Sequence, residues 1–190
     1  MRTFVAIELS DQIKTYLNKI QNQLRTSGAD IKWVEPENIH LTLKFLGEID
    51  DKKLAKVVEI LKATAADGFE FYLRLASLGA FPNLNSPRVI WVGLDQGDKE
   101  TKEIAETLED KLAEIGIPEE NRSFSSHITI GRSRSGLNRI KLTPLLKDLS
   151  NIPGEENLRF KVTKITLYKS TLTPKGPVYE ALKEVSLKTN

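Results

Sequence analysis

The chain has 190 residues, of which 39% are apolar and 28% charged, and its formal net charge is +2. This length and apolar content suffice for one compact domain, so residues 1–190 are expected to form a single domain. The absence of cysteine excludes disulfides, thiolate metal sites and a cysteine nucleophile, and the small net charge excludes nucleic-acid recognition by bulk charge alone.

The first half of the chain alternates predicted strands and helices. Residues 3–9 favour a strand, and Ser10 or Asp11 can cap a following helix that Gly28 ends. A strand over residues 31–34 and a turn at 35–38 come next. A second helix is expected from Asp50. The apolar residues that recur at helical spacing, and are expected to face the core, are Ile13, Leu17, Ile20 and Leu24, then Leu54, Val57, Val58 and Leu61.

The second half shows the same order of elements. Residues 69–78 and 89–94 favour strands, with a loop between them at 81–87 that holds two prolines and two asparagines. A third helix carries Ile104, Leu108, Leu112 and Ile115 on one face and ends near Gly116, and a strand is expected over residues 122–132. In each half a helix precedes one strand of a matching pair, the strand that begins at residue 40 and the strand over residues 122–132. This order predicts two similar lobes related by a pseudo-two-fold axis.

Those two strands carry the only histidines. His40 and His127 each begin the pattern histidine, apolar, threonine, apolar, with Thr42 and Thr129 at the third position. Because side chains alternate along a strand, each strand presents an imidazole and a hydroxyl on one face and aliphatic residues on the other. A single histidine in a strand is usually structural, but the repeated pattern favours one symmetric site for general acid and base catalysis.

The paired segments resemble the signature of the 2H phosphoesterase superfamily, and within it the RNA 2′,3′-cyclic phosphodiesterase family, formerly called 2′-5′ RNA ligases. Further similar stretches are residues 1–8, 33–38, 40–47, 88–93, 168–172 and 176–179. The resemblance implies an α+β fold in which two pseudo-symmetric lobes surround a central cleft, each lobe a mostly antiparallel sheet with helices on its outer face.

The resemblance also implies roles for the site residues. His40 would be the proton donor and His127 the proton acceptor in the hydrolysis of a 2′,3′-cyclic phosphate RNA end to a 2′-phosphate. Thr42 and Thr129 would donate hydrogen bonds to the non-bridging phosphate oxygens. The residues alone make the two imidazoles near equivalents, so the reverse assignment stays open.

Substrate-binding candidates lie near both signatures. Lys44 shares the face of His40 if alternation is strict. Arg132 would point away from His127 unless a bulge at Gly131 re-aims it, and the family places an arginine beside the phosphate there. Arg134, Tyr168 and Lys169 are further candidates for contacts to the RNA backbone or to a stacked base.

Two windows, residues 121–147 and 157–179, contain no Asp or Glu, which favours a polyanionic partner. They hold Arg122, Arg132, Arg134, Arg139, Lys141 and Lys147 in the first, and Arg159, Lys161, Lys164, Lys169 and Lys175 in the second. The alternative is that acids elsewhere in space neutralise these cations.

The sequence predicts neither a cofactor nor a metal, because it has no cluster of histidines or cysteines and no Gly-rich nucleotide-binding fingerprint. The expected partner is an RNA end bearing a 2′,3′-cyclic phosphate, with transfer RNA fragments suggested only by the resemblance; no obligate protein partner is evident. The apolar N-terminal stretch is too short for a signal peptide and no membrane span is evident, so the cytoplasm is the expected location. Three alternatives remain open: an ATP-independent 2′-5′ RNA ligase, a non-catalytic RNA-end binding module, and a phosphodiesterase acting on small cyclic nucleotides.

Overall fold

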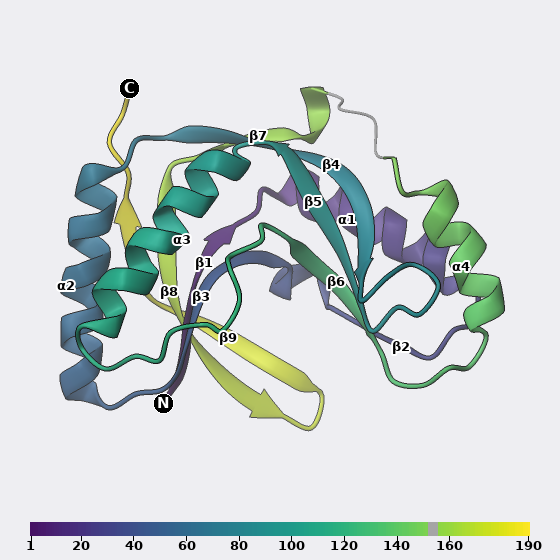
Figure 1. The fold of residues 1–190 in the computed structure, drawn as a ribbon, viewed down its shortest axis with the longest axis horizontal. Coiled ribbons are helices and arrows are strands. Elements are labelled where there is room, and N and C mark those ends of the chain that lie inside the picture. The colour runs from purple at the N-terminus through teal and green to yellow at the C-terminus, as the bar shows by residue number, and fades with distance from the viewer. Residues whose placement is uncertain (152–155) are drawn as a thin grey trace.

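A computed structural model describes residues 1–151 and 156–190 and shows two antiparallel sheets set against each other (Figure 1). The first sheet has the order β3 (His40–Glu48), β1 (Arg2–Glu8), β8 (Lys164–Thr173) and β9 (Gly176–Ser186). The second has the order β2 (Ile31–Trp33), β6 (Ile128–Ser133), β5 (Val89–Gln96), β4 (Phe71–Phe81) and β7 (Arg159–Val162). The predicted α+β class with two antiparallel sheets is confirmed.

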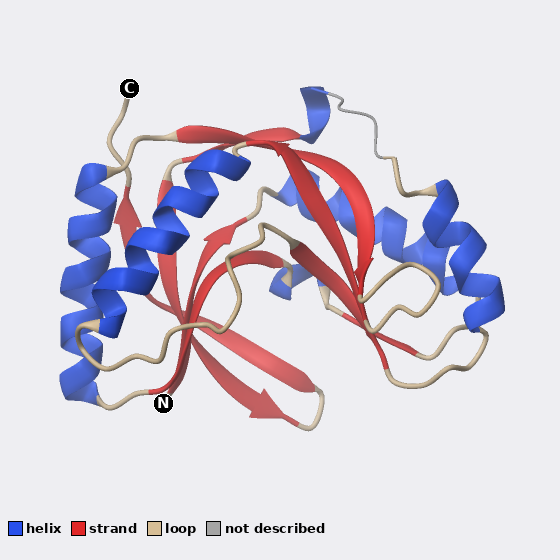
Figure 2. Cartoon of the chain, viewed as in Figure 1, coloured by secondary structure: helices blue, strands red, loops and turns tan. Residues whose placement is uncertain are grey.

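Helices cover the outer side of each sheet (Figure 2), and each sheet is covered by one helix from the first half of the chain and one from the second half (Figure 1). The first sheet is covered by α2 (Asp51–Asp67), which contacts β8 and β9, and by α3 (Asp98–Ala113), which contacts β3. The second sheet is covered by α1 (Asp11–Arg25), which contacts β6, and by α4 (Arg139–Asp148), which packs on α1. Each sheet therefore depends on a helix and on strands from both halves.

The capping signals and apolar stripes account for the first two helices. Ser10 Oγ accepts from the Ile13 backbone N–H at 3.4 Å, and Asp50 Oδ1 accepts from the Lys53 N–H at 2.7 Å. The predicted inward residues of α1 are all buried, whereas in α2 Val57 and Leu61 are buried and Leu54 and Val58 are only partly so. Local capping and burial of one face thus explain where these helices begin and how they pack.

A buried glutamine joins α1 to the second sheet. The fully buried amide of Gln21 donates to the carbonyl oxygens of Val34 and Ile130, both at 2.8 Å. The Val34 N–H also donates to Ile130 O at 3.0 Å. Both amide hydrogens of Gln21 are therefore used to hold β6, the strand that follows His127, against a helix from the other half of the chain.

The second half differs from the prediction in two places. The strand expected over residues 122–132 begins only at Ile128, so His127 lies at the end of the preceding loop. Helix α4 was not predicted, because Pro144 lies inside it and only Leu142 and Leu146 of its residues are buried. In the described parts of the chain, no helix is long and apolar enough to cross a membrane.

Candidate active site

The two histidines are held in the same way. His40 Nδ1 lies 2.7 Å from the carbonyl oxygen of Asn38, and His127 Nδ1 lies 2.7 Å from that of Ser125, in each case two residues earlier in the chain. A carbonyl can only accept, so Nδ1 carries the hydrogen in both rings. This leaves both Nε2 atoms to exchange protons with a ligand.

His40 is enclosed by aromatic rings. It stacks on Phe4 with 4.9 Å between ring centroids, and Tyr179 meets it edge-on at 5.3 Å. The pKa of His40 is lowered from 6.5 to about 4: burial is the main cause, the hydrogen bond to Asn38 opposes the shift, and the charge of Lys14 contributes to it. Its Nε2 lies 2.9 Å from Thr42 Oγ1, so the imidazole and hydroxyl predicted to share a face do so.

His127 has a matching but more open environment. Phe81 meets its ring edge-on at 5.4 Å between centroids, and Phe81 in turn lies 5.2 Å from Trp91. The ring is half-buried, like that of His40. The two signature strands, β3 and β6, contact each other across the sheets. His40 begins β3 and His127 directly precedes β6, so the two histidines come from adjoining parts of opposite sheets.

Both signature strands contain a bulge at the same position. Thr42 pairs with Ala6 and Lys44 with the next residue, Val5, so Leu43 is an extra residue in β3. In β6 the extra residue is Ile130, because Thr129 pairs with Trp91 while Gly131 pairs with Ile90. An extra residue reverses the alternation of the side chains that follow it. The predicted bulge near Gly131 is thus present, and β3 has its counterpart.

The bulge removes Lys44 from the site, so the prediction that Lys44 shares the face of His40 was wrong. Only 2% of Lys44 is exposed, and its ammonium lies 2.8 Å from Glu109 Oε2 and donates to Pro118 O at 2.7 Å. The position equivalent to Lys44 in the other strand is Gly131. A Cβ on Gly131 would lie 2.8 Å from Ile31 Cγ2. A side chain fits after the bulge in β3 and not in β6.

The same shift brings Arg132 onto the face of Thr129. Arg132 pairs with Val89 and Thr129 with Trp91, two residues apart on β5, so the two side chains share a face. Arg132 is exposed and lies near Tyr179. Burial raises the pKa of Tyr179, and the charges of Arg2 and Arg132 oppose that rise. Arg132 is therefore the guanidinium that the bulge turns toward the signature residues.

Of the remaining substrate-binding candidates, one lies at the site and two lie outside it. Tyr168 stacks on Phe4 at 5.3 Å and lines the cavity beside His40. Lys169 lies on the opposite face of β8, paired with the buried Thr3, and forms an ion pair with Glu180 at 3.7 Å. Arg134 lies beyond the end of β6 with an exposed side chain. The structure thus brings Tyr168 to the site and leaves Lys169 and Arg134 outside it.

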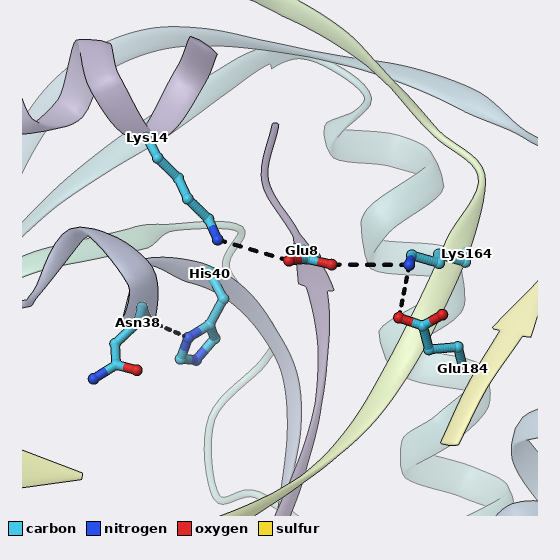
Figure 3. Close-up of polar contacts among 6 residues, drawn as sticks. All are labelled: Glu8, Lys14, Asn38, His40, Lys164 and Glu184. Atoms are coloured by element: carbon cyan, nitrogen blue, oxygen red, sulfur yellow. Dashed lines mark hydrogen bonds and ion pairs between the residues drawn. The ribbon is translucent and has the colours of Figure 1, made fainter. Parts of the chain in front are cut away.

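A cavity of about 420 Å³ opens beside His40. Tyr168, Tyr179 and Asn38 form part of its wall. Figure 3 shows its charged side, where Glu8 lies between Lys14 at 3.7 Å and Lys164 at 3.9 Å, and Lys164 contacts Glu184 at 2.7 Å. Sequence reasoning missed Phe4, Asn38 and Tyr179 as site residues. Aromatic residues are common in strands of any function, so the sequence did not mark Phe4 and Tyr179 as site residues.

In the described ranges, no group of three or more His, Cys, Asp or Glu side chains is placed to hold a metal ion. The signature segments themselves supply five polar groups: the two imidazoles, the two threonine hydroxyls and the Arg132 guanidinium. All five come from β3, β6 and the residue before β6.

Comparisons with known proteins find similar sequences and similar folds. An RNA 2′,3′-cyclic phosphodiesterase of Methanocaldococcus jannaschii is 38% identical over 184 residues, which cover 97% of this chain and 99% of that protein. The crystal structure of TT0787 of Thermus thermophilus has a TM-score of 0.82 at 29% identity and covers 98% of both chains. That of E. coli LigT complexed with 3′-AMP has a TM-score of 0.77 at 27% identity and covers 98% of this chain and 97% of LigT.

The family model described as LigT like Phosphoesterase matches this chain twice, over residues 7–91 and again over 92–179. Each match contains one histidine and its threonine. The two matches cover nearly the whole sequence, and this protein belongs to the LigT-like phosphoesterase family.

Proposed function

We propose that this protein is an RNA 2′,3′-cyclic phosphodiesterase that hydrolyses cyclic phosphate ends to 2′-phosphates by general acid and base catalysis. The observation that carries the proposal is the matched pair of imidazoles, each with Nδ1 tied to the backbone two residues earlier, one at the start of β3 and the other directly before β6, two contacting strands with the same bulge. The relatives named RNA 2′,3′-cyclic phosphodiesterase support RNA with a cyclic phosphate end as the substrate class.

In the proposed reaction, His127 takes a proton from water, and the resulting oxygen attacks phosphorus. The bond from phosphorus to the ribose 3′ oxygen breaks, and His40 gives that oxygen a proton, which leaves a 2′-phosphate. Thr42, Thr129 and Arg132 hold the non-bridging oxygens as negative charge grows on them. Ligation would be the same attack on phosphorus with a 5′-hydroxyl in place of water, which forms a 2′-5′ phosphodiester and uses the same residues.

The environment of His40 places a condition on this assignment. With a pKa of about 4 in the free protein, His40 is uncharged at neutral pH and has no proton to give from Nε2. A bound phosphate is negative and stabilises the imidazolium, so it raises the pKa of His40. The ligand itself would thus convert His40 into the acid.

We therefore expect NMR titration of the free protein to place the His40 transition near pH 4, and saturation with 3′-AMP to move it upward by at least one unit. The His40→Gln variant assigns the signal. If His40 still titrates near pH 4 in the complex, it acts as the proton acceptor and the two roles are reversed.

The activity is tested on a short RNA that ends in a 2′,3′-cyclic phosphate, in buffer containing EDTA, with the end group identified by mass and by resistance to a 3′-specific phosphatase. We expect conversion to a 2′-phosphate. Tight binding of this RNA without conversion would instead indicate an RNA-end binding module.

A further inference from the structure

Beside the site lies a second cavity, of about 460 Å³, between the two sheets. One wall consists of Lys32 and Trp33 of β2, the turn that follows them, and Arg132 of β6; the other is the tip of the β8–β9 hairpin, residues 173–179. We call this cavity the hairpin groove. Asn38 and Tyr179 line both the groove and the cavity at His40, so the two spaces adjoin.

Cations without acidic partners gather in the groove. Lys32, Arg132 and Lys175 are exposed, and none of the carboxylates in the described residues lies within 4 Å of any of them. Other lysines of the basic window 157–179 are neutralised: Lys161 by Glu70, Lys164 by Glu8 and Glu184, and Lys169 by Glu180. The cations left for an external anion thus include three that meet at one place.

The sheet register makes this arrangement costly without a ligand. Lys32 pairs directly with Arg132 across β2 and β6, so two positive side chains lie side by side on one face. Like charges at directly opposed positions of antiparallel strands destabilise the pair. Glu35 and Glu37 also line the groove and offset part of the charge, but three cations against two carboxylates leave an excess of one positive charge.

We infer that the hairpin groove binds the phosphodiester backbone of single-stranded RNA on the 5′ side of the nucleotide that carries the cyclic phosphate. This inference rests on the proposed function. The terminal phosphate lies between the histidines, and the preceding phosphodiester lies against Lys32 and Lys175. Arg132 stands where the groove meets the site and contacts the chain nearest the reacting phosphate. The groove makes a longer RNA a better substrate than a cyclic mononucleotide.

The test compares kcat/KM for a 2′,3′-cyclic mononucleotide and for a short single-stranded RNA with the same end. The variant is Lys32→Gln/Lys175→Gln. The control, Lys52→Gln/Lys56→Gln, removes the same charge from exposed positions on α2, the helix that covers the far side of the first sheet. We expect the RNA-to-mononucleotide ratio to fall at least tenfold in the groove variant and to stay as in the wild type in the control.

Salt dependence gives a second readout. Each phosphate contacted on a single strand contributes about 0.7 to the slope of log binding constant against log salt, so loss of the one phosphodiester held by Lys32 and Lys175 should flatten that slope by about 0.7. Anisotropy of a labelled RNA with a plain 3′-phosphate measures this without catalysis, which separates a failure of the groove from a failure of the proposed activity. An unchanged ratio and slope, or equal losses in the control, would overturn the inference.

Discussion

Replacing either histidine, in His40→Ala or His127→Ala, is expected to lower kcat on a cyclic phosphate end by about 10²–10⁴-fold, the usual contribution of one general acid or base. Each signature segment contributes one imidazole, and a hydrogen bond from its Nδ1 to the backbone fixes the orientation of the ring. Because both histidines act in one step, kcat of the double variant should be only slightly lower than that of the less active single variant. Single-turnover assays measure the losses.

Thermal unfolding serves as the control for these variants, because His40 also packs on Phe4 and Tyr179. His40→Gln keeps a side chain of similar volume there and should be as inactive as His40→Ala. Near wild-type turnover in any of the three single variants would refute two-histidine catalysis.

The second large effect concerns stability. Removing the partner of a buried charge in Glu109→Ala should lower the free energy of unfolding by about 3–5 kcal/mol, because the Lys44 ammonium would remain desolvated. Only 1% of the Lys44 side chain is exposed, and Glu120 Oε1, at 4.0 Å, is a distant substitute. Urea unfolding followed by circular dichroism gives the value.

Two further variants test whether the loss of stability in Glu109→Ala comes from the unpaired Lys44 charge. Lys44→Met/Glu109→Leu removes both charges and should recover most of the loss, as apolar replacements of buried pairs do. Glu103→Ala removes an exposed partner of Lys99, at 3.8 Å on the same helix, and should cost less than about 1 kcal/mol. A loss in Glu109→Ala no larger than in Glu103→Ala would show that the buried pair contributes little.

The sequence was sufficient for the elements with strong local signals and for the signature strands. Ser10, Asp50 and the apolar stripes located α1 and α2, and the repeated histidine and threonine pattern located the two strands that meet. Helix α4 has no such stripe and was not predicted, and the strand predicted over residues 122–132 extended too far toward the N-terminus, because residues 122–127 form a loop.

The side-chain directions after each threonine depend on a bulge, which is a property of strand pairing and not of local sequence. A glycine at position 131 suggested the bulge in β6. Nothing comparable marks Leu43, so strict alternation placed Lys44 in the site. In the structure, Phe45 contacts Phe4 on the face of His40, and Lys44 is buried on the other side. A repeated motif would have justified carrying the bulge from one strand to the other.

The exchange of helices and strands between the halves has a consequence for synthesis on the ribosome. The first sheet needs β8 beside β1, and these strands are separated by most of the chain. The second sheet needs β7, which begins at Arg159. Neither sheet can be completed while the first repeat alone has emerged, and its apolar strand faces must wait for partners that are translated last. The nascent chain therefore acquires both histidines before either sheet is complete.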